Sequence, residues 1–380
     1  MKRLICLILT TVLLVGAIPL IGSAAPEVAA KSAFLMDVAT GTVLYEQNAH
    51  GKLPPASVTK VMTMLLIMEA IADGRLKWED PVTASETAAA KGGSQIYLKE
   101  GETLSVTDMV KAIAVSSAND CACAMAEHLY GSEAAFVEKM NQRAGELGMA
   151  DTHFINCTGL DDGPDGNTHV TSAHDIALMS RQLLKYHPEI TKFTTIWMDT
   201  VRDGQFGLSN TNKLVRFYDG ATGLKTGFTS AAGYCLSASA RRDGMDLVAV
   251  VMGAETSKDR FNACKALLDY GFANYCVVRP ETESVSVPVK LGNEKTVRAV
   301  PGQPLELLIE KAQKSDLRIT TEAETQVTAP VSKGQRLGEL TVRVGERILA
   351  QIPLVAESTV EKLSFWQLLE QVLRSLSMAK

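Results

Sequence analysis

The sequence predicts an α+β protein: an antiparallel sheet flanked by helices, with a helical subdomain, then a small all-β domain and a C-terminal amphipathic helix. Two observations support this prediction. Strand patterns lie on both sides of a helical middle section, and a closing helix precedes a region of short alternating apolar runs. Strands separated by a helical insertion suit a sheet covered by helices, with a cleft at the sheet edge.

The composition is that of a folded globular protein. The 380 residues are 46% hydrophobic and 21% charged, enough for about two domains and not polar enough for disorder. The formal net charge is −5. Because phosphate binding needs a basic surplus, this balance disfavours a nucleic-acid partner.

The first 24 residues have the pattern of a secretory signal peptide. A basic start at 1–3 precedes an almost unbroken apolar run over 4–21, and small residues at 22–25 suit cleavage after Ala24. An uncleaved signal anchor is the alternative. Both interpretations export the rest of the chain, to the outer face of the cytoplasmic membrane or the cell wall.

The first expected domain covers 25–278. It begins with a β-hairpin over 33–46 that turns at Gly41. Apolar periodicity then predicts helices at 58–72, 106–115, 120–129, 133–147 and 173–186. Strands follow at 223–228, 233–240 and 247–252, and a helix at 257–275 closes the domain.

The pattern of apolar residues changes after Pro280. Short alternating apolar runs broken by glycine and proline predict a small β-sandwich or barrel over 279–357. Segment 358–380 repeats apolar residues at intervals of three and four, which predicts an amphipathic helix with Trp366 near its start. Such a helix suits peripheral attachment to a membrane surface, or packing on the β domain or on a partner helix.

Cysteine and histidine spacing indicates neither a disulfide scaffold nor a metal site. One of the seven cysteines, Cys6, lies in the signal segment, and the others are widely spaced. We expect small buried thiols, with one long-range disulfide as the alternative. The six histidines show no paired ligand spacing, so no metal is predicted.

The first chemical motif is a serine and a lysine at the start of a strongly apolar helix. Ser57 and Lys60 lie three residues apart and share one face of the first turn. Ser57 would lie at the positive end of the helix dipole, and a desolvated, neutral Lys60 could take its hydroxyl proton. The alternative is a capping serine followed by a solvated lysine.

Two further motifs make the first one specific. Ser117 and Asn119 fall between two predicted helices, where a tight turn could project both side chains into a cleft. In the predicted strand at 223–228, Lys225 supplies positive charge and Gly227 would let a substrate backbone approach closely. Ser-x-x-Lys, Ser-x-Asn and Lys-Thr-Gly are specific together when they occur in this order.

With these motifs, the sequence resembles the penicillin-binding serine enzymes, and most closely the low-molecular-mass D-alanyl-D-alanine carboxypeptidases. The resemblance covers nearly the whole chain and includes the segments 55–60, 117–120 and 223–227. It implies a β-lactamase/transpeptidase-like fold and removal of the terminal D-alanine from peptidoglycan stem peptides that end in D-Ala-D-Ala. It also implies covalent inhibition by β-lactams, without a cofactor.

The resemblance also implies roles for single residues. Ser57 would be the acylated nucleophile, Lys60 its general base and Ser117 a proton relay. Asn119 would position the substrate peptide. The oxyanion hole would consist of the backbone N–H groups of Ser57 and Phe228.

The substrate carboxylate would bind Lys225 and Thr226, but the sequence departs from some family members nearby. Those members have arginine where this chain has Thr211, and histidine where it has Phe228. Carboxylate recognition would then depend more on Arg260, for which a solvated charge on a helix is the alternative.

Two other functions use similar motifs. A class A β-lactamase needs a glutamate to activate its deacylating water, but no glutamate lies between Glu146 and Glu189. A catalytically silent peptidoglycan-binding or penicillin-sensing protein would lack the nucleophile or the base, and both Ser57 and Lys60 are present.

Overall fold

The computed structural model describes residues 25–161, 168–281 and 283–370, so the expected signal peptide at 1–24 lies outside the described residues. The chain divides into two compact units, one ending at Asn274 and the other beginning at Tyr275. In the described part of the chain, no helix is both long and apolar enough to span a membrane.

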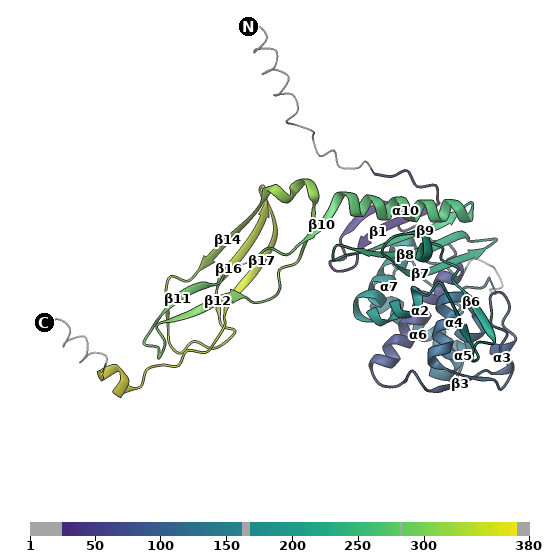
Figure 1. Ribbon diagram of the computed structural model, residues 1–380, viewed down its shortest axis with the longest axis horizontal. Helices are drawn as coiled ribbons and strands as arrows, with labels where there is room; N and C mark the ends of the chain where they lie inside the picture. The colour runs from purple at the N-terminus through teal and green to yellow at the C-terminus, as the bar shows by residue number, and fades with distance from the viewer. Residues whose placement is uncertain (1–24, 162–167, 282, 371–380) are drawn as a thin grey trace, which may run out of the picture. The chain divides into compact units, whose positions relative to one another are not determined.

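A five-stranded antiparallel sheet forms the centre of the first unit. Its strand order is β2-β1-β9-β8-β7, so β7 is an edge strand. Helix α10 covers one face and α7 packs on the other (Figure 1). The bounds are Ser32–Asp37 for β1, Val43–Gln47 for β2, Ala221–Thr229 for β7, Gly233–Arg242 for β8, Met245–Ala254 for β9, Ala173–Tyr186 for α7 and Ser257–Asn274 for α10.

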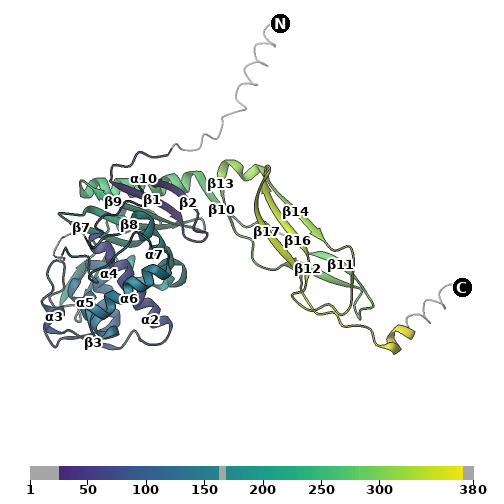
Figure 2. The ribbon, with the colours of Figure 1, turned by 180° about the vertical axis from the view of Figure 1, so that it is seen from behind.

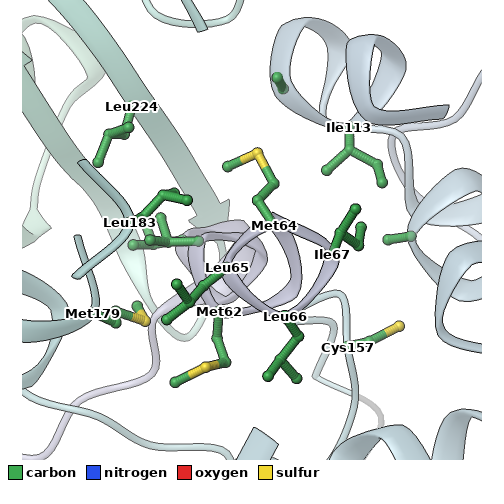
Figure 3. Close-up of a cluster of buried hydrophobic side chains, with 14 of the residues drawn as sticks. Met62, Met64, Leu65, Leu66, Ile67, Ile113, Cys157, Met179, Leu183 and Leu224 are labelled. Atoms are coloured by element: carbon green, nitrogen blue, oxygen red, sulfur yellow. The ribbon is translucent and has the colours of Figure 1, made fainter. Parts of the chain in front are cut away.

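The helical subdomain packs around α2, Lys60–Ala72, which is apolar on nearly all sides. Figure 3 shows Met64, Leu65 and Ile67 of α2 pointing in different directions, toward the sheet and toward neighbouring helices. A helix of this kind must be buried all round. The surrounding helices are α4 at Val106–Ser116, α5 at Asn119–Tyr130 and α6 at Glu133–Glu146.

The predicted long elements of this unit are confirmed, but short ones were missed. Helix α2 is preceded by a 3-10 turn, η1, at Ala56–Thr59, rather than starting as an α-helix at residue 58. Strands of three or four residues are too short to show periodicity in a sequence. The missed elements are β3 at Pro81–Thr83, α3 at Glu86–Ala89, β4 at Thr103–Ser105, η2 at Pro188–Ile190, α8 at Thr191–Thr194, β5 at Met198–Val201, β6 at Phe206–Ser209 and α9 at Leu214–Phe217.

The second unit is an all-β domain, as the alternating apolar runs predicted. A six-stranded sheet has the order β14-β16-β17-β12-β11-β15, and β10 pairs with β13 in a separate sheet (Figure 2). The strands are β10 at Tyr275–Val278, β11 at Val285–Lys290, β12 at Thr296–Pro301, β13 at Leu307–Glu310, β14 at Leu317–Ala323, β15 at Val327–Thr328, β16 at Arg336–Val344 and β17 at Arg347–Ala356, with η3 at Lys311–Asp316. The expected domain boundary at residue 278 therefore differs from the structural division, because β10 pairs within this unit.

The C-terminal helix begins later than expected. Val360 is fully buried in the core of the β domain and forms a bridge with Val331, while Lys362 bridges to Gly292. The helix starts at Phe365, where Phe365 and Trp366 are 71% and 74% exposed. The start predicted at 358 was wrong. The apolar side chain of Val360 was taken as part of the helical repeat, whereas Val360 pairs with Val331 and belongs to the β domain. Residues 371–380 lie outside the described part.

The six cysteines after the signal segment are free thiols. Five of them are buried and Cys276 is half-buried. This agrees with the expectation of small buried thiols rather than the alternative of a long-range disulfide.

Candidate active site

Ser57 and Lys60 meet where η1 runs into α2. The Lys60 Nζ lies 3.0 Å from the Ser57 Oγ, and it also donates a hydrogen bond of 2.7 Å to the backbone carbonyl of Thr158. Residues three apart face the same side of a helical turn, which is why the short spacing brings the two groups together. The pairing expected from Ser-x-x-Lys is therefore present.

The environment of Lys60 favours the neutral amine. Its side chain is fully buried, and burial lowers the pKa of Lys60 to about 7, while the charge of Asp120 acts in the opposite direction. A neutral amine has one lone pair. With one hydrogen directed at the Thr158 carbonyl, that lone pair can accept the proton of the Ser57 hydroxyl.

Ser117 and Asn119 lie at the sharp junction between α4 and α5. Ser117 adopts a left-handed backbone conformation with φ of 64°, and Asn119 is held by a hydrogen bond of 2.7 Å from its Nδ2 to the Gly92 carbonyl. Among the residues that the structure describes, the buried Ser117 Oγ and Asn119 Oδ1 have no hydrogen-bond partner. Buried polar atoms without partners are costly, so both atoms are suited to contact a ligand.

Strand β7 passes close to the turn that carries Ser57. A Cβ built on Gly227 would lie 2.6 Å from the Pro55 carbonyl oxygen and 3.1 Å from the Ser57 nitrogen. Only glycine permits this approach, because any side chain would push the strand away. Phe228 follows at the sheet edge with 53% exposure, and its ring stacks on Tyr234.

Lys225 and Thr226 are both buried beside this edge. The Lys225 Nζ donates to the Thr226 carbonyl at 3.0 Å, and burial, reinforced by the charges of Lys60 and Arg260, holds the pKa of Lys225 well below its usual value. The Thr226 hydroxyl lies 2.6 Å from the hydroxyl of Thr211. A substrate carboxylate placed here would favour the protonated form of Lys225.

Thr211 connects β7 to the Ser117 turn, through its hydroxyl on one side and its backbone on the other. Its N–H donates to the carbonyl of Val115 at 3.2 Å, two residues before Ser117. Together with the close approach of Gly227 to the Ser57 nitrogen, these contacts bring the three motifs around one site.

The Arg260 side chain, on helix α10, is buried against the edge strand β7. Its guanidinium donates to the carbonyls of Gly227 at 3.1 Å and Cys235 at 3.3 Å. Its Nε has no partner within the described part of the chain. The alternative of a solvated helix charge is wrong, because Arg260 is only 7% exposed.

Groups that act through the backbone or from a distance were not predicted from the sequence. The Thr158 carbonyl contacts Lys60, yet a carbonyl group belongs to every residue and leaves no signal in a sequence. The buried carboxylate of Asp120 accepts the N–H groups of Ile96 and Leu98, which fixes the loop facing Asn119. Its place directly after Ser-x-Asn was the available signal.

Comparison with known proteins assigns the family. Residues 21–256 match the Peptidase S11 family, described as D-alanyl-D-alanine carboxypeptidase. This chain belongs to the S11 peptidases. Residues 274–362 also match the C-terminal domain of penicillin-binding protein 5, which covers the β domain.

Individual S11 relatives extend over almost the whole chain. The D-alanyl-D-alanine carboxypeptidase DacF of Bacillus subtilis is 41% identical, and the alignment covers 98% of each chain. Penicillin-binding protein 5 of Haemophilus influenzae has a similar structure, with a TM-score of 0.75 and 30% identity over 90% of this chain and all of that one. Penicillin-binding protein D2 of Listeria monocytogenes, solved in an ampicillin-bound form, has a TM-score of 0.59 and 35% identity over 65% of this chain and all of that one.

Family membership gives the activity of this S11 peptidase. It is a D-alanyl-D-alanine carboxypeptidase with a serine mechanism, and β-lactams inhibit it. The rival assignment as a class A β-lactamase is not supported, since the S11 match and the second-domain match together cover both units.

Proposed function

We propose that Ser57 is the nucleophile of this carboxypeptidase and Lys60 its general base. The observation that carries the proposal is the buried Lys60 amine, 3.0 Å from the Ser57 Oγ and 2.7 Å from the Thr158 carbonyl. A lysine acts as a base only when desolvation lowers its pKa toward neutrality. Burial has this effect on Lys60, whose pKa is lowered to about 7.

Acylation begins when the Ser57 Oγ attacks the carbonyl of the penultimate D-alanine. The serine proton passes to the Lys60 amine as the C–O bond forms. The negative charge that develops on the carbonyl oxygen is stabilised by the backbone N–H groups of Ser57 and Phe228. The close approach of Gly227 to the Ser57 nitrogen supports this pairing across the site.

The second half of acylation breaks the peptide bond to the terminal D-alanine. Ser117 relays a proton from Lys60 to the leaving amine nitrogen, and Asn119 holds the substrate backbone. The unpaired Ser117 Oγ and Asn119 Oδ1 support these roles. Water then attacks the acyl-enzyme, and hydrolysis releases the shortened peptide and restores the Ser57 hydroxyl.

The terminal carboxylate of the substrate binds at strand β7. Lys225 supplies charge, the Thr226 hydroxyl supplies a hydrogen bond, and Gly227 gives the space for a close approach. Arg260 adds positive charge from beneath the strand while its hydrogen bonds hold the Gly227 carbonyl. A β-lactam presents a carboxylate to the same groups, but its leaving group stays tethered after Ser57 opens the ring.

The same proposal gives the enzyme a place outside the cell. Its substrate is cell-wall peptidoglycan, and segment 1–24 has the pattern of a signal peptide. The exposed Phe365 and Trp366 at the start of the C-terminal helix suit peripheral contact with the outer face of the membrane.

A covalent labelling experiment tests the assignment of Ser57. The mature protein is incubated with benzylpenicillin, and intact mass and peptide mapping locate the adduct. We expect one penicillin per chain, on the peptide that contains Ser57, and none in Ser57→Ala. Ser286→Ala, which changes an exposed serine of the β domain, serves as the matched control and should label like the wild type. An adduct on another residue, or fast turnover of penicillin without an adduct, would contradict the proposal.

A further inference from the structure

A buried hydrogen-bond chain ends on the residue directly before Ser57. The Thr59 Oγ1 donates to the Ala56 carbonyl at 2.8 Å and lies 2.8 Å from the Nε2 of His169. On the other side of the ring, the His169 Nδ1 accepts the N–H of Ile155 at 3.1 Å. Thr59 and His169 are both buried.

The partners of His169 fix the direction of this chain. A ring nitrogen that accepts an N–H carries no proton, so the proton of the neutral imidazole lies on Nε2 and is donated to Thr59. The Thr59 hydroxyl must then give its own hydrogen to the Ala56 carbonyl. Burial, with repulsion from His153 and Lys60, lowers the pKa of His169 to about 4, which keeps the ring neutral.

The Ala56 carbonyl is held from two sides. Ala56 has a φ of 49°, a left-handed conformation that residues with a Cβ rarely adopt. A Cβ built on Gly159 would lie 1.8 Å from the Ala56 oxygen, so the Gly159 backbone packs directly against it. The Thr59 hydroxyl and Gly159 therefore hold the carbonyl in an orientation that the backbone alone does not favour.

We propose that Thr59 and His169 are positioning residues that aim the Ser57 N–H at the substrate oxyanion. The Ala56 carbonyl and the Ser57 N–H belong to one planar peptide group, in which they point in opposite directions. Fixing the direction of the carbonyl therefore fixes the direction of the N–H. This inference rests on the proposed function, in which the Ser57 N–H is an oxyanion-hole donor.

A matched pair of variants at Thr59 tests the hydroxyl. Thr59→Val keeps the shape and loses the hydroxyl, whereas Thr59→Ser keeps the hydroxyl. Because a misaimed donor weakens binding of the transition state more than binding of the substrate, Thr59→Val should lower kcat about 10- to 100-fold with KM within about twofold. Thr59→Ser should stay within about threefold of the wild type.

A second pair of variants tests the imidazole ring of His169. This pair can be measured even if Thr59→Val does not fold. His169→Gln keeps an N–H donor toward Thr59, and His169→Leu removes it. We expect the kcat loss in His169→Leu and its recovery in His169→Gln. The double variant of Thr59→Val and His169→Leu should lose no more than either single variant, because both act through one chain. If the kcat losses of the two single variants multiply in the double variant, the inference is overturned.

A boronic acid analogue of the substrate separates positioning from general damage. Ser57 adds its oxygen lone pair to boron, its proton passes to Lys60, and one oxygen of the tetrahedral adduct occupies the oxyanion hole. In Thr59→Val the affinity for this analogue should fall by the same factor as kcat/KM, with the melting temperature of Thr59→Ser as the folding control.

If Thr59→Val keeps its affinity for the boronic acid, or if only its KM changes, the positioning role is overturned. The wild type would still release D-alanine in that case. A wild-type protein that neither releases D-alanine nor becomes acylated would instead overturn the proposed function. The two failures are therefore distinguishable.

Discussion

At the scale of single residues, the site depends on charged groups that the fold keeps out of water. Lys60 and Lys225 are both buried, and the charge of Lys60 acts on Lys225. Each therefore loses its proton more readily than a lysine in solvent, because burial disfavours the charged form of both, and for Lys225 the charges of Lys60 and Arg260 act in the same direction. In the proposed mechanism, the neutral Lys60 amine is the base, and a bound substrate carboxylate favours the protonated form of Lys225.

The pH dependence of acylation follows from Lys60. Only the neutral amine accepts the Ser57 proton, and the Lys60 pKa is about 7. The second-order rate of acylation by benzylpenicillin should rise about tenfold per pH unit below this value and level off above it. Lys60→Arg, which stays protonated, should lower the rate at least about 100-fold. A flat profile down to pH 5 would contradict the role of Lys60.

The charge of Arg260 is tested by comparing two substrates. Arg260→Gln should reduce kcat/KM about tenfold for a peptide that ends in a free carboxylate, because one positive charge is lost near the binding site. The same peptide with a C-terminal amide has no carboxylate and should react equally with both proteins. An equal loss on the two substrates would mean that Arg260 only supports strand β7 through its bond to Gly227.

The sequence predicted which side chains come together in the Ser-x-x-Lys and Ser-x-Asn motifs, because their spacing is short and local. Ser57 and Lys60 are one turn apart, and Ser117 and Asn119 share one tight junction. The sequence could not predict the Thr158 carbonyl, since its contact with Lys60 joins parts of the chain 98 residues apart. The sequence also left open whether Arg260 is a solvated charge, because burial of its side chain against a sheet edge is a tertiary property.

At the scale of elements, helix α2 is the part on which the site is built. Its side chains fill the space between the sheet and the helical subdomain, and it begins at Lys60 itself (Figure 3). Long helices such as α2 and α7 could be predicted from apolar periodicity. The β3–β4 and β5–β6 pairs could not, because their strands are too short to repeat a pattern.

Core packing of α2 gives a stability prediction. Leu65 is fully buried, so Leu65→Ala should lower the free energy of unfolding by about 2–5 kcal/mol. Leu65→Met keeps most of the volume and should cost less than about 1.5 kcal/mol. Urea unfolding followed by tryptophan fluorescence measures both, since Trp78 and Trp197 lie in the first unit. Equal stability of the two variants would contradict the packing around α2.

At the scale of the whole molecule, the chain forms two units with separate apolar cores. The first holds all the proposed catalytic residues, and the second has its own apolar core, which includes Val360. The sequence predicted both units from the change in apolar pattern. It placed the start of the last helix too early, because Val360 fits a strand and a helix pattern equally well until its bridge to Val331 is known.

The proposed peripheral contact with the membrane through the C-terminal helix can be tested by truncation. In the mature protein, deletion of 365–380 should abolish co-sedimentation with vesicles of mixed zwitterionic and anionic phospholipid, because it removes the exposed Phe365 and Trp366. Ile348→Ala, which changes another exposed apolar residue of the β domain, is the control and should sediment like the parent. Undiminished sedimentation of the truncated protein would place the membrane contact elsewhere.

The most direct test of the account is release of D-alanine. The mature protein is incubated with an acyl-Lys-D-Ala-D-Ala peptide, and free D-alanine is measured against time for the wild type and for Ser57→Ala. We predict steady release by the wild type, none by Ser57→Ala, and none from the same peptide ending in L-alanine. Equal release by the wild type and Ser57→Ala, or no release by either, would contradict the central claim.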